Sequence, residues 1–407
     1  MSVKTYRFTS PQGGAADARP ATPPFPKTTE PLFMKTTKQY FIVLTAAVLL
    51  AACNNDADSP SGEGYLPSDR AITFDASEEE AATRANGLMD DDVLKQKGFG
   101  VFGSYTGKLT YENTTVSSDF MYNQQVTYNT TGNVWEYQPL KYWPNTPTDY
   151  VSFFAYAPYE ATPRDDGRCI IDMSKREDLG DPWLNYRIAD NPWSTVQPQV
   201  DLLYGQREEG TSWLDQQKYN YDAAPLKFIF RHALGCIGDK ITIRMASDLS
   251  TLITGYASIT VTNVTVNYKN LTTKGRLVLR SEGSANWKEI ISGEITTTRT
   301  YNKNVNLTFT PSSSEEQTVS QGDGLFYIPL QVAGTDAPCA EVTIAYTVTN
   351  NASHSYSGTA STTFPLDMNL EGKKQGIALQ LTKSLDLQHL VYEIGTSATE
   401  PSYSRKR

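Results

Sequence analysis

Apolar and polar residues alternate with a period of two in many short stretches of this chain, and this pattern predicts an all-β fold. Residues 133–137 alternate in this way, and residues 151–158 are apolar on both faces, as in a central sandwich strand. Further strands are expected at 226–230, 241–243, 257–268, 325–330, 342–348, 377–381 and 385–394. No stretch has the period of a helix longer than a few turns. Many short strands joined by turns are typical of antiparallel β-sandwiches.

The strand expected at 257–268 contains an irregularity. Its apolar positions change parity between Val261 and Val264. Because side chains alternate between the two faces of a strand, one extra residue is needed to keep both valines on the buried face. The sequence therefore predicts a β-bulge near Thr262 and Asn263.

Upstream of the strands, the chain carries the features of an export signal. Basic residues at Lys35 and Lys38 precede an apolar run at 41–50, which is followed by Ala51-Ala52-Cys53. Ten apolar residues are too few to cross a bilayer, whereas this order of charge, apolar run and small residues is typical of a signal peptide. The cysteine indicates lipoprotein processing, with cleavage between Ala52 and Cys53 and acyl chains on Cys53. Two or three such chains would hold a protein at a membrane.

Changes in composition divide the chain into segments. We expect translation to begin at Met34, with 1–33 an extension that has no role in the protein and 34–52 the signal peptide. Residues 53–84 read as a polar tether and propeptide that contains a first short strand at Ile72-Thr73-Phe74. A turn-rich break that includes Pro225 then separates two sandwiches, and the segments after residue 84 are 85–222, 223–395 and a disordered tail at 396–407.

Charge narrows the classes of partner. The full chain has a formal charge of −9, with 36 basic and 45 acidic residues. The first 52 residues hold six of the basic and two of the acidic residues, so 30 and 43 remain and the charge from Cys53 onward is −13. A surface this acidic argues against nucleic acid and anionic lipid as partners.

The chain shows no sequence motif of an enzyme. Its three histidines are His232, His354 and His389, and none lies in a metal-binding or catalytic motif. Gly-x-Ser-x-Gly and phosphate-binding loops do not occur. His232 adjoins the apolar stretch 228–230, so we expect it to have a packing role. We therefore predict a protein that is not an enzyme and needs no cofactor.

Metal binding is not expected either. Cys169, Cys236 and Cys339 lie far apart without a CxxC spacing, which argues against zinc or an iron–sulfur cluster. One disulfide is compatible with an oxidising compartment, and burial as small apolar side chains is the other interpretation. The runs Glu78-Glu79-Glu80 and Asp90-Asp91-Asp92 lack the spacing of a calcium loop and are interpreted as solvated linkers.

Several motifs, taken in order, resemble those of the fimbrillins, the subunits of type V pili. The export signal and the strand 72–74 followed by Thr83-Arg84-Ala85 begin the series. Its further members are Gly100-Val101-Phe102, Trp135-Glu136-Tyr137, Tyr142-Trp143-Pro144, the stretch 153–158, Asp201-Leu202-Leu203-Tyr204 and Phe230-Arg231-His232-Ala233-Leu234. The resemblance covers residues 50–240. The C-terminal half is similar only in its general strand character.

This resemblance implies two tandem transthyretin-like β-sandwiches and an assembly pathway. The lipoprotein reaches the outer face of the outer membrane, where an Arg-specific protease cuts between Arg84 and Ala85. That cut removes the lipid and the first strand, which contains Ile72 and Phe74. A strand from another subunit, of the same or a different kind, then fills the open groove to form a fimbrium that serves cell adhesion. Arg70 is a rival cleavage site, but a cut there would leave the first strand in place.

The donor strand and the functional class each have alternatives. Two C-terminal stretches alternate with period two and are candidate donors: Ile377, Leu379 and Leu381, or Leu390, Tyr392 and Ile394. A close variant of the leading hypothesis is a tip or accessory subunit that binds host proteins or glycans. A different class is a lipoprotein that keeps its lipid and binds glycans through its tryptophans at 135, 143, 183, 193 and 213, although large aromatics are more often core residues.

Overall fold

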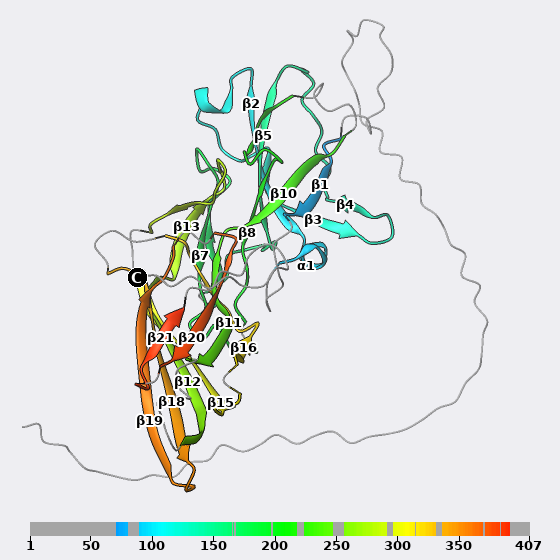
Figure 1. Ribbon diagram of the computed structural model, residues 1–407. Coiled ribbons are helices and arrows are strands. Elements are labelled where there is room, and N and C mark those ends of the chain that lie inside the picture. Colours follow the sequence, from blue (N-terminus) through cyan, green and yellow to red (C-terminus); the bar gives the residue numbers. More distant parts are fainter. Residues whose placement is uncertain are drawn as a thin grey trace, which may run out of the picture. The chain divides into compact units, whose positions relative to one another are not determined.

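The computed structural model describes residues 71–390 apart from 80–88, 165, 167, 197, 218–223, 247–255, 291–295, 314, 331–335, 369–370 and 383. The described chain is nearly all β, as the alternation predicted, with one short α-helix (Figure 1). The export signal with Ala52 and Cys53, the cleavage site at Arg84 and Ala85, Tyr392, Ile394 and the tail at 396–407 lie outside the described residues. No helix in the described part is both long and apolar enough to span a membrane.

The largest sheet lies in the N-terminal half. Its strand order is β1-β10-β8-β5-β2-β3-β4, and β9 pairs with β5. The bounds are β1 Phe74–Glu78, β2 Phe99–Gly107, β3 Met121–Asn129, β4 Val134–Glu136, β5 Tyr150–Ala157, β8 Leu203–Gln206, β9 Trp213–Gln216 and β10 Leu226–His232. Strand β5 lies between β2 and β8, and seven of its eight residues are buried. This confirms the central strand that its two apolar faces predicted.

A second sheet joins strands from both halves of the sequence. Its order is β14-β13-β7-β6, with bounds β6 Cys169–Met173, β7 Trp183–Arg187, β13 Lys274–Val278 and β14 Asn286–Lys288. Strand β10 likewise pairs with β8 in the N-terminal sheet, although the break expected at 222–223 would assign it to the C-terminal sandwich. The sheets therefore do not divide at 222–223. The physical reason is that strand pairing is a long-range choice, which a turn-rich break does not determine.

Two further sheets form the C-terminal half. One has the order β16-β11-β20-β21, and β17 pairs with β11; the other has the order β15-β12-β18-β19. The bounds are β11 Gly235–Met245, β12 Tyr256–Thr272, β15 Thr296–Phe309, β16 Gln317–Gln321, β17 Leu325–Tyr327, β18 Cys339–Asn350, β19 Ser355–Pro365, β20 Lys374–Leu381 and β21 Leu387–Leu390. Both pairings of β12 shift register between Val261 and Asn263, which confirms the predicted bulge.

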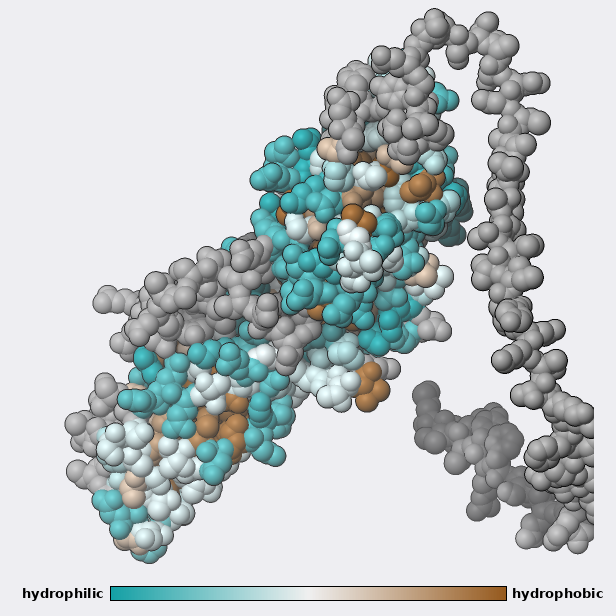
Figure 2. Space-filling view, turned by 90° about the vertical axis from the view of Figure 1, so that its right-hand side faces the viewer, coloured by the Kyte–Doolittle hydropathy of each residue, from teal (hydrophilic) through white to brown (hydrophobic). Residues whose placement is uncertain are grey.

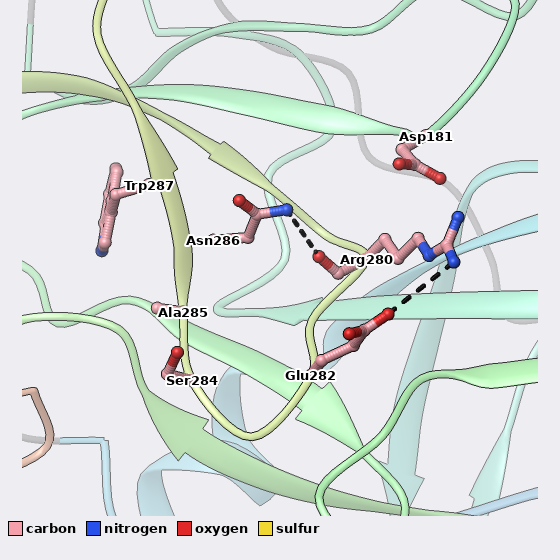
Figure 3. A pocket seen from close by; sticks show the side chains of 7 residues that line it. All are labelled: Asp181, Arg280, Glu282, Ser284, Ala285, Asn286 and Trp287. Atoms are coloured by element: carbon pink, nitrogen blue, oxygen red, sulfur yellow. Dashed lines mark hydrogen bonds and ion pairs between the residues drawn. The ribbon is translucent and has the colours of Figure 1, made fainter.

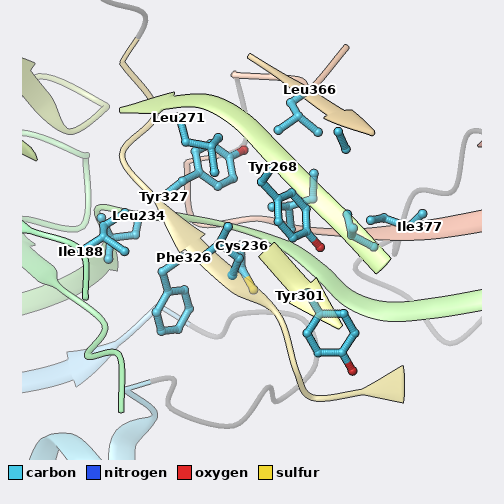
Figure 4. Packing of buried hydrophobic residues seen from close by; sticks show 14 of the residues in the cluster. Ile188, Leu234, Cys236, Tyr268, Leu271, Tyr301, Phe326, Tyr327, Leu366 and Ile377 are labelled. Carbon is cyan, nitrogen blue, oxygen red and sulfur yellow. The ribbon is translucent and has the colours of Figure 1, made fainter. Parts of the chain in front are cut away.

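Buried side chains form two clusters. The larger begins on one face of the N-terminal sheet with residues such as Phe154 and Tyr204, and it continues into the C-terminal sheets. Figure 4 shows its C-terminal part, where Tyr268, Tyr327 and Cys236 lie close together. The smaller cluster covers the other face of the N-terminal sheet and includes the first strand. The face drawn in Figure 2 is mainly hydrophilic, with separate small hydrophobic areas.

The acidic run at 90–92 is a helix start, not the solvated linker expected from sequence. Helix α1 spans Asp91–Lys97, and the Asp90 carboxylate accepts a hydrogen bond from the Val93 amide. A carboxylate satisfies the free N–H groups at a helix start and interacts favourably with the helix dipole. Leu94 anchors the helix in the smaller cluster.

Gly98 ends α1 in a conformation that only glycine adopts without strain. Its φ is +67°, and a Cβ atom there would collide with the Val126 carbonyl oxygen. We expect Gly98→Ala to lower the free energy of unfolding by more than Gly180→Ala, measured by urea denaturation. Gly180 is the matched control because its φ is also positive, at +95°, but nothing lies within 4 Å of its Cβ position. Backbone strain of about 1–3 kcal/mol is common to both variants. Equal costs would show that the Val126 contact is unimportant.

Candidate functional site: the slot that holds the first strand

Strand β1 lies in a slot between strand β10 and the segment that follows β4. On one side it runs parallel to β10, from Phe74 opposite Leu226 to Glu78 opposite Phe230. On the other side, Ala71 bridges to Tyr142, and the Ile72 amide donates a hydrogen bond of 2.9 Å to the Lys141 carbonyl. An extended segment of about eight residues thus closes the gap between β10 and the chain that follows β4. We define the slot as the site that β1 occupies.

The inner face of the first strand is apolar and buried. Ile72, Phe74 and Ala76 are 0%, 4% and 8% exposed. The Phe74 ring packs against three aromatic rings, with centroid separations of 5.4 Å to Tyr137, 5.8 Å to Phe153 and 5.8 Å to Phe228. Burial of Ile72 and Phe74 contributes about 3–6 kcal/mol in total at about 1.5–3 kcal/mol each. Side-chain burial is therefore one of the main contributions that hold the strand, beside its backbone ladder with β10.

Two side chains of the slot bind the backbone of the first strand. Trp135 Nε1 donates to the Ala76 carbonyl at 3.3 Å, and the Tyr137 hydroxyl donates to the Ile72 carbonyl at 2.8 Å. Burial raises the pKa of Tyr137 to about 12, so the hydroxyl keeps its proton at neutral pH. Because both acceptors are main-chain carbonyls, these contacts do not depend on which residues the strand carries. Any strand of suitable shape could use them.

A buried ion cluster closes one end of the slot. Nδ1 of His232, on β10, lies 2.6 Å from Oδ2 of Asp201, and Nε2 lies 2.8 Å from Oε1 of Glu78, on β1. The side chains of His232, Asp201 and Glu78 are 6%, 1% and 10% exposed. Ionised carboxylates only accept hydrogen bonds, so both ring nitrogens must donate, and the ring must be the imidazolium cation. The Met89 amide also donates to Asp201, which fixes that carboxylate.

The electrostatics of His232 agree with this geometry. Burial alone lowers the pKa of His232, but the Asp201 and Glu78 carboxylates outweigh it and raise the pKa to about 10. Burial lowers the pKa of Lys374 on β20, and Asp239, Asp201 and Glu78 act against that decrease. A cation from the C-terminal half thus interacts with the same carboxylates.

Residues beside this cluster make further polar contacts. The Tyr204 hydroxyl donates a hydrogen bond of 2.6 Å to Oε1 of Glu371, which also accepts the Ala285 amide. Arg231 pairs with Glu79 at 3.1 Å, and the Glu79 side chain is 54% exposed. Because that second pair is solvated, it contributes little to holding the strand. The buried pair of Glu78 and His232 is the principal polar contact at this end.

The predicted site residues fall into three groups. Ile72 and Phe74 are buried in the slot. Cys53, Arg84 and Ala85 lie outside the described residues, but in chain order Arg84 lies between the end of β1 at Glu78 and the start of α1 at Asp91. The candidate donor strands form the third group.

The two candidate donors occupy different positions in one sheet. Ile377, Leu379 and Leu381 belong to β20, which pairs with β11 on one side and β21 on the other, and all three are at most 1% exposed. Leu390 ends β21, the last strand of that sheet, and it is half-buried. Tyr392 and Ile394 follow beyond the described residues.

The tryptophans that were candidates for glycan binding are mostly packed against other side chains, and one polar hollow lies elsewhere on the chain. Trp135, Trp143 and Trp213 are buried, Trp193 packs against Tyr268 and Tyr301, and Arg276 lies 3.7 Å over the Trp183 ring. Trp135, Trp143 and Trp213 are therefore core residues, whereas Trp183 and Trp193 are partly buried. A polar hollow of about 450 Å³ is lined by Asp181, Arg280, Glu282, Ser284, Ala285, Asn286 and Trp287 (Figure 3). Its arginine pairs with Glu112 and Glu282, so its charge is already neutralised.

Within the described residues, the cysteines form no disulfide and belong to no metal-binding cluster. Cys169 and Cys236 are buried free thiols, and Cys339 is a half-buried free thiol. Burial raises the pKa of Cys169 to about 11, so this thiol is not a reactive thiolate at neutral pH. The described part of the chain holds no group of three or more His, Cys, Asp or Glu side chains that could bind a metal.

Sequence reasoning missed part of the slot. Ala76 and Glu78 continue the alternation of Ile72 and Phe74, but the acidic run Glu78-Glu79-Glu80 reads as linker. A longer alternation window would have included both residues in the strand. The pairing of His232 with Asp201 has no local signal, because 31 residues separate the two.

Comparisons with known proteins agree on one kind of protein. A family model described as fimbrillin-like matches residues 83–396. Fimbrium subunit Fim1C of Phocaeicola vulgatus is 24% identical over 220 residues, which cover 53% of this chain and 54% of that protein. The matched part thus spans about half the length of this curated relative. The crystal structure of a fimbrial protein from Bacteroides vulgatus has a TM-score of 0.59 at 20% identity and covers 82% of this chain and 99% of that chain. At that identity the structural likeness shows the fold alone.

Proposed function

Since this chain belongs to the fimbrillin-like family, we propose that it is a structural fimbrial subunit that is exported as a lipoprotein and polymerises by strand exchange. The lipid on Cys53 holds the subunit at the outer face of the outer membrane. An Arg-specific protease cuts after Arg84, and the first strand leaves its slot. A strand from another subunit replaces it, and the resulting fibre serves adhesion. This is a structural role and involves no catalysis by the chain.

One observation supports the proposal: β1 fills a slot in the fold, and the expected cleavage site follows β1 in chain order, before α1. Strand β1 ends at Glu78, before Arg84, while α1 begins at Asp91, after it. Cleavage between them breaks the only covalent link of the strand to the rest of the fold. Cleavage at Arg70 would leave β1 attached. The family match also begins at residue 83, so β1 precedes it.

An empty slot favours a new strand for two physical reasons. It exposes the β10 edge, whose amide and carbonyl groups lose their partners, and an apolar groove lined by Tyr137, Phe153 and Phe228. An extended peptide satisfies both at once by adding a strand to the sheet. The donor must recover the several kcal/mol that Ile72 and Phe74 contribute, less the cost of its own ordering.

Of the two candidate donors, the segment that contains Leu390, Tyr392 and Ile394 is favoured. Strand β20 is paired on both sides and its apolar residues are buried, so its departure would dismantle the C-terminal sheet. Strand β21 is at the end of that sheet. Removal of an end strand disrupts one set of backbone hydrogen bonds instead of two.

The N-terminus of the assembled subunit tests the proposal. We expect fibres sheared from cells to contain subunits that begin at Ala85, identified by mass spectrometry of the N-terminal peptide. Arg84→Ala and Arg84→Lys should both abolish processing and fibre formation, because an Arg-specific protease accepts neither residue. Arg70→Ala is the matched control and should assemble normally.

Other N-termini would contradict this function. Fibres built from subunits that begin at lipidated Cys53 would mean that the anchor is permanent. Normal fibres from Arg84→Ala would mean that removal of the first strand is not required.

A further inference from the structure

The buried ion cluster of His232, Asp201 and Glu78 makes one end of the slot charged, unlike the rest of the slot. Along the strand, contacts are either apolar, through Ile72 and Phe74, or made to main-chain carbonyls. Only at Glu78 does a buried side chain of the strand make a hydrogen bond to a charged group of the slot. That group, His232, lies on β10 and stays in the protein when the strand leaves.

Departure of the first strand leaves His232 with one of its two partners. Asp201 stays, because it precedes β8 and also accepts the Met89 and Leu202 amides. Once the strand has left, water can reach Nε2 and accept its proton. A new strand that excludes this water but brings no acceptor leaves Nε2 as a buried, charged donor without a partner, which disfavours that strand. Lys374, which interacts with the Glu78 carboxylate, loses the same negative charge.

On the basis of the proposed strand exchange, we propose that His232 selects the incoming strand, which must present a carboxylate to Nε2 at the end of the slot. The preferred occupant is a strand with three alternate apolar side chains followed, two residues later on the same face, by Asp or Glu. Strand β1 has this pattern in Ile72, Phe74, Ala76 and Glu78. His232 is thus a specificity residue and not merely a part of the core.

The chain's own candidate donors lack this pattern. The same-face neighbours of Leu390, Tyr392 and Ile394 are Gln388 and Thr396. Those of Ile377, Leu379 and Leu381 are Gln375 and Lys383. None carries a carboxylate in either strand direction. Glu393 would face the opposite side from Leu390 and Tyr392 by simple alternation. Gln388 and Gln375 offer Nε2 only a neutral acceptor, so the charge of the acceptor favours a strand from a different subunit over one from a second copy of this chain.

Peptide exchange on the cleaved full chain tests the proposal. The chain is cut with an Arg-specific protease, and a fluorescent peptide of residues 71–80 is titrated in. The Glu78→Gln peptide is expected to bind about tenfold more weakly, because the amide oxygen of Gln still accepts the Nε2 proton but carries no charge, so a charge-assisted hydrogen bond becomes a neutral one. Asp75→Asn is the matched control: it removes the same charge from the same strand, away from His232, and should bind like the parent.

Two further arms examine the mechanism and the preference for another subunit. In His232→Gln protein, Glu78→Gln should weaken binding no more than Asp75→Asn. A peptide of residues 386–396 is expected to bind more weakly than the 71–80 peptide. Gln388→Glu and Thr396→Glu place a carboxylate at its two ends, and one of them should improve binding at least tenfold. If His232→Gln does not fold, the comparison of the parent, Glu78→Gln and Asp75→Asn peptides on wild-type protein still tests whether the slot selects a carboxylate.

The outcomes separate this inference from the function on which it rests. If the cut protein fails to exchange its first strand for even the parent peptide, the strand-exchange function fails and this inference with it. If the parent peptide exchanges but Glu78→Gln binds equally well, or neither added carboxylate improves the C-terminal peptide, strand exchange stands and the selection by His232 is wrong.

Discussion

Truncation of Phe74 to alanine is expected to weaken the docking of the first strand by about 3–5 kcal/mol, the usual cost of removing a buried phenylalanine side chain. The ring contacts Tyr137, Phe153 and Phe228, so its loss leaves a cavity in the middle of the slot. That cost corresponds to a rise of roughly a hundredfold to several thousandfold in the open population of the slot. We expect the cleaved variant to release its strand sooner and to polymerise faster than the wild type.

Amide hydrogen exchange measures this effect in the uncut chain. The Ile72 and Glu79 amides donate to the Lys141 and Phe230 carbonyls, and both should lose protection in Phe74→Ala. Amides of β5 should keep theirs, because that strand is central in the sheet. Thr73→Ala is the matched control, since its side chain is exposed. Unchanged protection of Ile72 and Glu79 would show that side-chain burial does not hold the strand.

The alternation of apolar residues was sufficient to predict the all-β class, many of the strands and part of the site, although it did not identify β3, β15 or β19. Side-chain parity is a local property of a strand, so the two apolar faces of β5 and the bulge between Val261 and Asn263 could be predicted without knowledge of any partner strand. The same reasoning identified Ile72 and Phe74 as inward-facing residues of a first strand. Both are buried in the slot.

Pairing and charge networks could not be predicted in this way. Strand β1 pairs in parallel with β10, about 150 residues later, and β13 pairs with β7 across the expected domain break. Alternation says which face of a strand is buried but not which neighbour it has. His232 illustrates the consequence. Its apolar neighbours predicted a packing role, whereas its function in the fold depends on carboxylates from two distant segments.

The acidic runs at 78–80 and 90–92 were wrongly predicted to be linkers, because their partners could not be inferred from the sequence. Contiguous carboxylates are usually solvated, so both runs were interpreted as linkers. In the fold, Asp90 caps α1, Asp91 accepts the Glu78 amide, and Glu78 itself reaches His232. Asp90 finds its donor within its own helix, but Asp91 needs β1 beside α1, and Glu78 needs β10 beside β1. The charge pattern alone carries no sign of that contact.

The stability of the intact chain is expected to fall between pH 7 and pH 10 through His232. Its pKa rises from an ordinary value of 6.5 to about 10 in the fold, so the folded state binds the proton more tightly than the unfolded chain. The stabilisation is therefore complete below about pH 6.5 and is lost as the pH rises through 10. Between those values the loss approaches about 1.4 kcal/mol per pH unit.

The difference between wild type and His232→Gln isolates this contribution, measured by urea denaturation across the range. Two carboxylates contact the ring, Glu78 from β1 and Asp201 before β8, and both also interact with Lys374 from β20. The lowered pKa of Lys374 acts in the opposite sense, because a base that loses its proton more easily in the fold gains stability as the pH rises. The contribution of Lys374 is present in both proteins, so it cancels when the free energy of unfolding of the variant is subtracted from that of the wild type. A difference that does not change with pH would mean that His232 is not the imidazolium, and the charge recognition at the end of the slot would fail with it.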